Sequence, residues 1–475
     1  MKKRVIAVTM MFLLLASASI AQRRPQQEAD WDNAPKVVPR TTEEMQTPEF
    51  WINRIDGDPD KVVMTPDQIR TMNARNRSNP KPIKDINGDD YNIDRVVRSH
   101  DRIGELFAVE NPLNIKTFSG DSLRARLETV KDNLIRRNFY DRRQMHYDDD
   151  MKQELVDRMN MNNIPNVITP MYGITVKHTL NRIYPTEMPG FGQAQSWLDG
   201  FNSASIDVAA PVAILHTSSD GEWCYVRGEI SFGWVLAEDL AVAPVKQIAD
   251  YLAGKDIIVA TGYKVPIFSD ANFKTYLTTL FIGSNCQLAR RTSSGFQVKV
   301  PYRAANGSLM IVDGWIKPDA KVSVGYQPFT QRNIINTMFN MLYRPYGWAD
   351  SNHEFDCCGT VRVVLRTFGI KTGRWTSYEL HSTDNVIAFP RNTDSAKKYE
   401  LLKGHPGGIT LVGNAGHICT YLGEVDGNHY VIHQGGYSYK GDDKTYHFRR
   451  MNVNDAELDG GSNIGGWTEI TTIAP

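Results

Sequence analysis

Hydrophobic residues recur with a helical period in the first third of the chain. Between residues 41 and 167, apolar side chains lie three or four positions apart, most clearly over 122–134 and 151–159. This spacing puts apolar side chains along one face of a helix. We therefore expect a mostly helical N-terminal domain over residues 41–167.

After residue 168 the period changes to short alternating runs that are separated by turn dipeptides. Asp220-Gly221 and Asn306-Gly307 each join two such runs, and both dipeptides are typical of tight hairpins. The pattern predicts two small β-barrels in tandem, over residues 168–246 and 247–326. The aromatic residues of these runs are interpreted as barrel core rather than as substrate contacts.

The last segment, residues 327–475, mixes both periods. Apolar positions from Val361 to Phe368 have helical spacing and follow directly after Cys357, which places this cysteine at a helix N-terminus. Residues 416–422 and 429–433 alternate as two strands of a hairpin. The whole chain is thus expected to be a multidomain α+β protein with an α+β domain at its C-terminus.

The N-terminus has the features of an export signal. Three basic residues precede an apolar run over 5–16, and Ser19-Ile20-Ala21 supplies the small residues of a cleavage site. A membrane anchor is the alternative, but a spanning helix needs roughly 20 apolar residues. We expect a signal peptide over residues 1–21, a flexible polar leader over 22–40, no integral membrane segment after cleavage, and a location in the periplasm or outside the cell.

Composition and charge narrow the range of partners. The 475 residues contain 54 Lys plus Arg and 54 Asp plus Glu, so no overall field favours nucleic acid. The five cysteines lack the spacing of a zinc site, and the sequence has no phosphate-binding loop in a strand-to-helix setting. We expect a monomer without a metal or cofactor.

The position of Cys357 suggests nucleophilic chemistry. A helix N-terminus favours the negatively charged thiolate, which is the reactive form of cysteine. A buried structural pair with Cys358 is an equally good reading of the local sequence.

Two histidines further along the chain support the catalytic reading. His417 begins one strand of the C-terminal hairpin, and His433 lies in the returning strand. A cysteine followed by a histidine that a third polar group orients is a known arrangement for activating a thiol. A strict two-residue turn at Asp426-Gly427 would place His433 opposite Thr420, so the register that joins the two histidines is an assumption.

Residues 327 to 440 resemble the NlpC-type cysteine peptidases of bacterial cell walls. The matching stretches are PYGWADSNHEFDCCGTVRVVLRTFGI, PRNTDS and GHICTYLGEVDGNHYVIH. The resemblance implies a papain-like α+β domain in which Cys357 is the nucleophile, His417 the general base and His433 the third member of the triad.

The same resemblance implies a set of substrate-binding residues. Tyr346, Asp356 and Cys358 correspond to residues that bind the free amino group of the substrate, and Thr393 corresponds to a substrate-binding serine. Two positions depart from the family, because Cys358 replaces a serine and Ala349-Asp350 replaces a pair of glycines. These departures affect the substrate preference rather than the class of reaction.

The two barrels resemble bacterial Src-homology-3-like domains through DGEWCYVRGEISFGWV and PYRAANGSLMIVDGWI. With a helical N-terminal stabilisation domain they complete a cell-wall peptidase arrangement. In such proteins the first barrel narrows the active site around a free L-alanine.

The function implied is hydrolysis of the γ-D-glutamyl–diamino acid bond in peptidoglycan stem peptides, preferably those with a free N-terminal L-alanine. Two alternatives remain: a non-catalytic peptidoglycan-binding protein, and an amidase or acyltransferase that uses the same triad.

Overall fold

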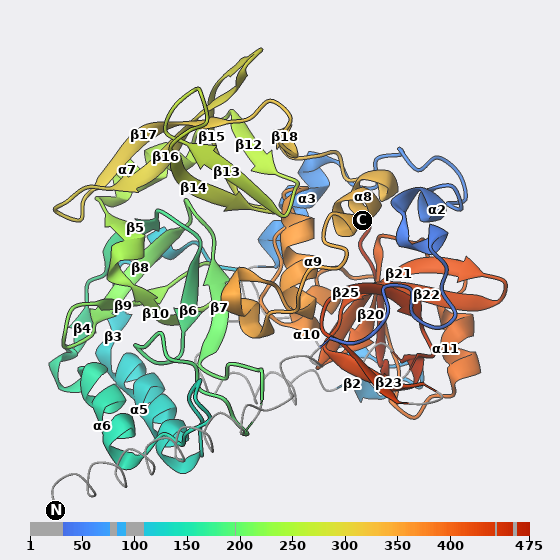
Figure 1. Cartoon of the computed structure of the whole chain (residues 1–475), viewed down its shortest axis with the longest axis horizontal. Helices are drawn as coiled ribbons and strands as arrows, with labels where there is room; N and C mark the ends of the chain where they lie inside the picture. The colour runs from blue at the N-terminus through green and yellow to red at the C-terminus, as the bar shows by residue number, and fades with distance from the viewer. Residues whose placement is uncertain (1–31, 77–82, 92–108, 195, 442–443, 459–462) are drawn as a thin grey trace, which may run out of the picture.

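The computed structural model describes residues 32–76, 83–91, 109–194, 196–441, 444–458 and 463–475. Three large sheets lie side by side in Figure 1, with the two barrels on one side and the C-terminal domain on the other. The expected multidomain α+β fold is confirmed. The predicted signal peptide lies outside the described residues. Within the described part of the chain, no helix has the length and apolar character needed to cross a membrane.

The first barrel is a seven-stranded antiparallel sheet with the order β11-β5-β8-β9-β10-β6-β7. The interior of the barrel is formed by alternate residues such as Val212, Cys224 and Val226. Trp223, Tyr225 and Trp234 are also buried, but they lie on the opposite face of the strands, in a hydrophobic cluster shared with N-terminal residues such as Leu127. These aromatic residues are therefore core, as expected, but of the contact between the barrel and the N-terminal helices rather than of the barrel itself. Its strands are β5 (Met171–Thr175), β6 (Thr179–Arg182), β7 (Asn202–Ile206), β8 (Pro211–Thr217), β9 (Trp223–Arg227), β10 (Phe232–Leu236) and β11 (Leu240–Val242).

The second barrel follows after helix α7 (Val245–Leu252) and has the order β14-β13-β17-β16-β15-β12-β18. Alternate residues of β16, such as Val298 and Val300, point into its core. Its strands are β12 (Ile257–Ala260), β13 (Lys264–Phe268), β14 (Tyr276–Phe281), β15 (Asn285–Thr292), β16 (Gly295–Arg303), β17 (Leu309–Ile316) and β18 (Val322–Val324).

The C-terminal domain has a six-stranded sheet with the order β19-β26-β20-β21-β22-β25. Helix α9 packs against β21 and β22, and both share one hydrophobic core. The elements of this domain are α8 (Gln331–Phe339), α9 (Cys357–Arg366), α10 (Thr376–Leu380), β19 (Val386–Ala388), α11 (Ser395–Leu402), β20 (Thr410–Asn414), β21 (His417–Val425), β22 (Asn428–Gln434), β23 (Tyr437–Lys440), β24 (Thr445–Phe448), β25 (Met451–Asp455) and β26 (Glu469–Thr472).

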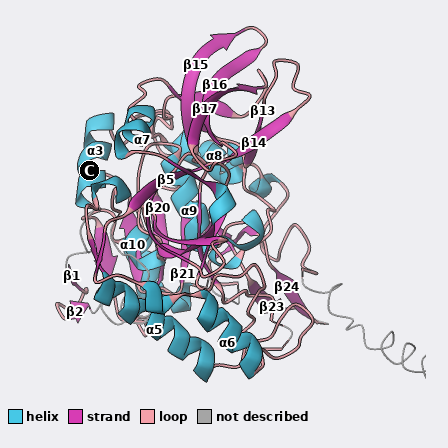
Figure 2. Cartoon of the chain, turned by 90° about the vertical axis from the view of Figure 1, so that its left-hand side faces the viewer, coloured by secondary structure: helices cyan, strands magenta, loops and turns pink. Residues whose placement is uncertain are grey.

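The described residues of the N-terminal segment 41–167 include four α-helices, and these belong to two different cores. Helices α2 (Pro48–Ile52) and α3 (Pro66–Arg75) contribute to the core of the C-terminal domain. Helices α5 (Gly120–Arg136) and α6 (Asp149–Arg158) share a hydrophobic core with the first barrel and lie below it in Figure 1. Figure 2 shows the two helices side by side at the lower edge of the molecule. The segment also contains the short strands β1 (Ile83–Lys84), β2 (Asp90–Tyr91), β3 (Phe118–Ser119) and β4 (Val167–Ile168).

The predicted flexible leader needs a correction for the residues that the structure describes. Val38 is almost fully buried against Tyr439 and Phe448. Asp32 pairs with Arg450, and the backbone of Asn33 hydrogen-bonds to His447. Residues 32–40 are thus packed against the C-terminal domain, because even this polar segment carries a buried apolar residue and one largely buried ion pair.

Candidate active site

Cys357 is the first residue of helix α9, as the sequence predicts. Asp356 is the N-cap, and its Oδ1 accepts a hydrogen bond of 2.7 Å from the amide of Gly359. The cap fixes the start of the helix and therefore fixes the position of the next side chain. The thiol of Cys357 lies in the buried first turn, at the N-terminal end of the helix.

A β-bulge brings the two histidines to the same face of the sheet. Val425 pairs with Asn428 across the predicted turn, but Leu422 is an extra residue between two registers. After the bulge Thr420 pairs with Ile432, so Cys419 and His433 lie opposite one another. Because side chains alternate along a strand, His417, two residues before Cys419, shares this face.

The imidazoles of His417 and His433 are joined directly. Nε2 of His417 lies 2.9 Å from Nδ1 of His433, and Nε2 of His433 lies 2.7 Å from Oδ1 of Asn454. The amide nitrogen of Asn454 donates to the carbonyl of Asp455, so Oδ1 is left as an acceptor.

This series assigns the protons. Since Oδ1 of Asn454 can only accept, His433 carries its proton on Nε2, and its Nδ1 accepts from His417. His417 therefore carries its proton on Nε2, and its Nδ1 is a free base. Sequence reasoning missed Asn454, because only the pairing of β25 with β22 reveals its neighbour.

Both histidines are neutral in the folded protein. Burial and the neighbouring His433 lower the pKa of His417 well below its usual value. Burial lowers the pKa of His433 to about 4, although the hydrogen bond to Asn454 partly opposes this shift. A neutral His417 is the form that can accept a proton from a thiol.

Tyr437 lies close to both histidines and to Cys357. Its ring centroid is 4.8 Å from that of His417 and 5.9 Å from that of His433. Burial raises the pKa of Tyr437, and the proximity of Cys357 raises it further. Among the hydrogen bonds of the described residues, none joins Cys357 to His417. Such bonds often tighten only when substrate is present.

Asp356 and Cys358 share a buried guanidinium. Arg374 donates 2.6 Å and 3.3 Å hydrogen bonds to the two oxygens of Asp356, and its Nη1 lies 2.7 Å from the sulfur of Cys358. Burial alone would raise the pKa of Asp356, but Arg374 reverses this and lowers it. The thiol of Cys358 has a pKa well above the usual value, mainly because it is buried. Cys358 therefore remains a protonated thiol at neutral pH.

Tyr346 lies next to the first barrel. Its ring makes an edge contact at 5.2 Å with Trp197, which comes from the loop before β7. A side chain at Gly436 would touch the same indole, and Arg449 lies 4.6 Å above it. The barrel thus forms one wall beside Tyr346, and Trp197 was not identified from sequence.

Ala349 and Asp350 show why glycines are usual at these positions. Both residues have left-handed backbones, with φ of 49° and 63°. Asp350 is fully buried and accepts hydrogen bonds from Arg362 at 2.7 Å and from the Ser205 hydroxyl at 3.0 Å. Its carboxylate links the first barrel to the helix that carries Cys357.

Thr393 lies apart from this cluster. It belongs to the turn between β19 and α11, and β19 is the edge strand, three places from β21 in the sheet. In the described part of the chain, no side-chain contact joins Thr393 to Cys357 or the histidines. Its substrate-binding role stays a prediction from the resemblance.

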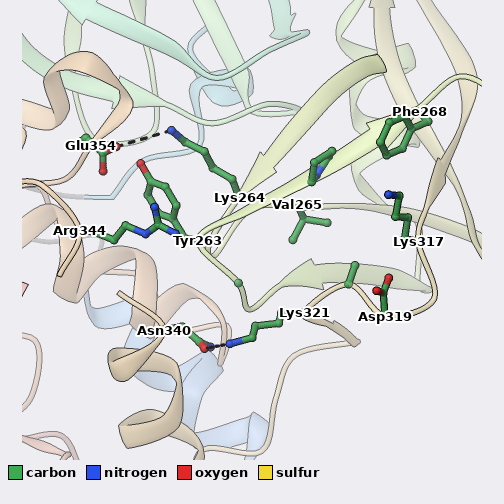
Figure 3. Close-up of a pocket in the computed structure, with 13 residues that line it drawn as sticks. Tyr263, Lys264, Val265, Phe268, Lys317, Asp319, Lys321, Asn340, Arg344 and Glu354 are labelled. Atoms are coloured by element: carbon green, nitrogen blue, oxygen red, sulfur yellow. Dashed lines mark hydrogen bonds and ion pairs between the residues drawn. The ribbon is translucent and has the colours of Figure 1, made fainter. Parts of the chain in front are cut away.

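Two cavities flank the stretch that precedes Cys357. Figure 3 shows one of about 660 Å³ between the second barrel and the C-terminal domain, in which Lys264 lies 3.8 Å from Glu354. Neither Cys357 nor the two histidines line it. A second cavity, of about 770 Å³, lies between the first barrel and residues 351–353, and Trp197 forms part of its wall.

Comparisons with known proteins agree with this architecture. Residues 197–236 match the family SH3 domain (SH3b1 type). No curated protein matches the chain. A solved NlpC/P60 endopeptidase from Photobacterium damselae subsp. piscicida is 17% identical with a TM-score of 0.66, over 89% of this chain and 96% of that one. An NlpC/P60 family protein from Bacillus cereus ATCC 10987 is 17% identical with a TM-score of 0.41, over 58% of this chain and 83% of that one. The chain has the fold of an NlpC/P60 endopeptidase that includes a bacterial SH3 domain.

Proposed function

We propose that this protein is a cysteine peptidase that hydrolyses the γ-D-glutamyl–diamino acid bond of peptidoglycan stem peptides. The observation that carries the proposal is the hydrogen-bonded series Asn454–His433–His417, which leaves Nδ1 of His417 as a base. Tyr437 lies beside His417 and near Cys357, which begins helix α9. Structural cysteine pairs need no such series of oriented imidazoles.

The reaction proceeds in two stages. Nδ1 of His417 takes the proton of Cys357, and the thiolate attacks the carbonyl carbon of the scissile amide. His417 then gives the proton to the leaving amine, and a thioester with the γ-D-glutamyl group remains. In the second stage His417 deprotonates water, the water attacks the thioester, and the proton returns to the sulfur. His433 holds the ring of His417 in place throughout.

The preferred substrate carries a free N-terminal L-alanine. Support comes from the wall that Trp197 forms beside Tyr346, which leaves little room for glycan at this end. Tyr346, Asp356 and Cys358 would surround the ammonium group. The carboxylate of Asp356 is already paired with Arg374, so the ammonium would share a charged pair rather than meet an isolated carboxylate.

The protein acts outside the cytoplasm as a monomer in this proposal. The support is the basic and apolar N-terminus followed by Ser19-Ile20-Ala21, which is typical of a cleaved signal. Peptidoglycan is assembled and turned over in that compartment, so substrate and enzyme would meet there.

The test offers three substrates to the purified protein: free tripeptide or tetrapeptide, the same peptide N-acetylated, and whole sacculi. Mass spectrometry should detect L-alanyl-γ-D-glutamate from the free peptide only. Cys357→Ala is the control and should give no product. If the acetylated peptide or the sacculi were cleaved at a comparable rate, the free-amine requirement would be wrong. The protein would then be a general cell-wall endopeptidase.

Two other outcomes would support the alternatives. Binding of sacculi without any product, unchanged in Cys357→Ala, would indicate a non-catalytic wall-binding protein. Transfer of the acyl group to an added amine in preference to water would indicate an acyltransferase.

A further inference from the structure

Cys419 is a buried thiol that the proposed mechanism does not use. It lies on β21 two residues after His417 and opposite His433, with its side chain on the same face as both. One ligand atom from each of these three residues lies within 4.8 Å of the others. The cluster is hidden in the sequence, because His433 follows His417 by 16 positions and only the bulged register unites them.

Two imidazoles and a thiol are a typical ligand set for zinc. Tetrahedral Zn²⁺ with bonds of about 2.0–2.3 Å requires ligand atoms about 3.4–3.8 Å apart. Nε2 of His417 and Nδ1 of His433 are now 2.9 Å apart, and the sulfur of Cys419 lies within 4.8 Å of one ring nitrogen of each histidine. Shifts of about 1 Å would therefore complete three corners of a tetrahedron, leaving the fourth for water.

We propose that His417, Cys419 and His433 form an inhibitory site for Zn²⁺. The inhibition rests on the proposed peptidase function, whereas the binding of Zn²⁺ to these three residues does not depend on it. Binding of the ion releases the thiol proton of Cys419 to solvent, and the sulfur coordinates as thiolate. The ion takes Nε2 of His417 and Nδ1 of His433, so the hydrogen bond between them is lost.

The coordination inhibits catalysis through the tautomer of His417. When Zn²⁺ occupies Nε2, a neutral His417 must carry its proton on Nδ1. This nitrogen is then no longer a base for Cys357. Because all three ligands are buried, binding requires local opening of the site, and inhibition should develop slowly.

The first experiment measures inhibition of stem-peptide cleavage after preincubation with Zn²⁺. Cys419→Ala should raise the concentration for half-inhibition by at least about tenfold, a loss typical even for partners of metal ligands. Cys419→Ser keeps the side-chain volume and should behave alike. Cys286→Ala, which removes a buried thiol of the second barrel, is the matched control and should keep the wild-type sensitivity. If both Cys419 variants were as sensitive to Zn²⁺ as the wild type, the proposal would be overturned.

The second experiment needs no enzymatic activity, so it separates failure of this site from failure of the proposed function. Co²⁺ is added to Cys357→Ala, and the sulfur-to-cobalt charge-transfer absorption is recorded. The band should appear in Cys357→Ala and disappear in the double variant Cys357→Ala/Cys419→Ala. A band that persists in the double variant would assign the metal to another thiol, such as Cys358, and would refute the site.

Discussion

The amide of Asn454 determines which nitrogen of each histidine carries a proton. Its Oδ1 accepts from His433, and this choice passes through His433 to His417. A third polar group behind a catalytic imidazole holds its ring and tautomer without taking part in proton transfer. Here His433 is the group behind His417, and Asn454 in turn holds His433. Asn454 is therefore a positioning residue for the site.

Replacing Asn454 by leucine should lower kcat by about 10- to 100-fold, the effect typical of a second layer of hydrogen bonds. KM should change little, because Asn454 is buried behind His433. Steady-state kinetics on the free tripeptide measures both constants. A large rise in KM with unchanged kcat would contradict the positioning role.

Asn454→Asp tests the hydrogen bond between Asn454 and His433 in a second way. A carboxylate at Nε2 of His433 favours the imidazolium and should raise the pKa of His433 above its present value of about 4. Protonated His433 donates from both nitrogens, so it can no longer accept from His417. The acid limb of the pH profile of kcat/KM should therefore move to higher pH in Asn454→Asp. If it did not move, the hydrogen-bonded series Asn454–His433–His417 would not control the protonation of the site.

The two histidines should differ in how much activity they support. His417→Ala removes the base and should reduce kcat by about 10²- to 10⁴-fold. His433→Ala removes only the orienting group and should retain a measurable rate. His433→Asn, whose amide oxygen can accept from Nε2 of His417, should recover part of the loss. Equal inactivity of all three variants would exclude a purely orienting role for His433.

Sequence predicted the start of the helix at Cys357 better than the side chains that surround the candidate site. Cys357 was placed at a helix start because apolar residues after it have helical spacing. Asn454, Arg374, Tyr437 and Trp197 come from distant segments, and their contacts depend on tertiary packing that no local period encodes.

At the level of elements, the bulge in β21 decides whether the site forms. The sequence predicted the turn at Asp426-Gly427 and the two strands, but this turn alone places His433 opposite Thr420. One extra residue, Leu422, shifts the pairing and moves His433 to the face of His417. Alternation of hydrophobic residues does not specify a single bulged position, so the register could not be derived.

Gly423 stabilises this bulge with a backbone that other residues rarely adopt, at φ of 140°. Gly423→Val should cost about 1–3 kcal/mol of strain or restore a regular register. Either result should lower activity, and urea unfolding together with peptide cleavage would measure it. Gly416→Ala is the control. Gly416 precedes His417, its backbone does not have a positive φ, and a methyl group fits there. This control should retain stability, and a loss as large as that in Gly423→Val would remove the special role of the bulge.

A buried ion pair joins the first barrel to the helix of Cys357. Asp350→Ala leaves the guanidinium of Arg362 without its 2.7 Å partner and frees Ser205 of β7. Breaking such a pair costs about 3–5 kcal/mol. Thermal unfolding should show a lower Tm. Asp60→Ala, which breaks an exposed pair with Arg332, should leave the Tm unchanged.

At the scale of the whole molecule, the sequence predicted which kinds of units exist but not how they are combined. Hairpin turns and alternation identified both barrels, and helical spacing identified the N-terminal helices. The period of a helix shows that one face is buried, but not against which partner. Trp51 of α2 therefore joins the C-terminal core, whereas Leu127 of α5 joins the first barrel.

The neutral buried histidines should make the folded protein sensitive to acid. The pKa of His433 is about 4 in the folded protein, compared with an ordinary value of 6.5. Above pH 6.5 the imidazole is neutral in both states, and it has no effect on stability. As the pH falls from 6.5 to 4, the unfolded chain binds a proton that the folded chain refuses, so the free energy of unfolding decreases. Such a shift corresponds to about 3 kcal/mol at pH 4.

His433→Gln isolates this contribution, because glutamine cannot be protonated. Urea unfolding at pH 7, 6, 5 and 4 should show a shallower acid decline in His433→Gln than in the wild type, with the two curves converging toward pH 4. His146→Gln is the control, a histidine replacement at an exposed position where the ring centroid lies 4.1 Å from that of Tyr140. If the free energies of unfolding of the wild type and His433→Gln fell in parallel with pH, His433 would titrate alike in the folded and unfolded chains. That result would contradict a buried, neutral His433.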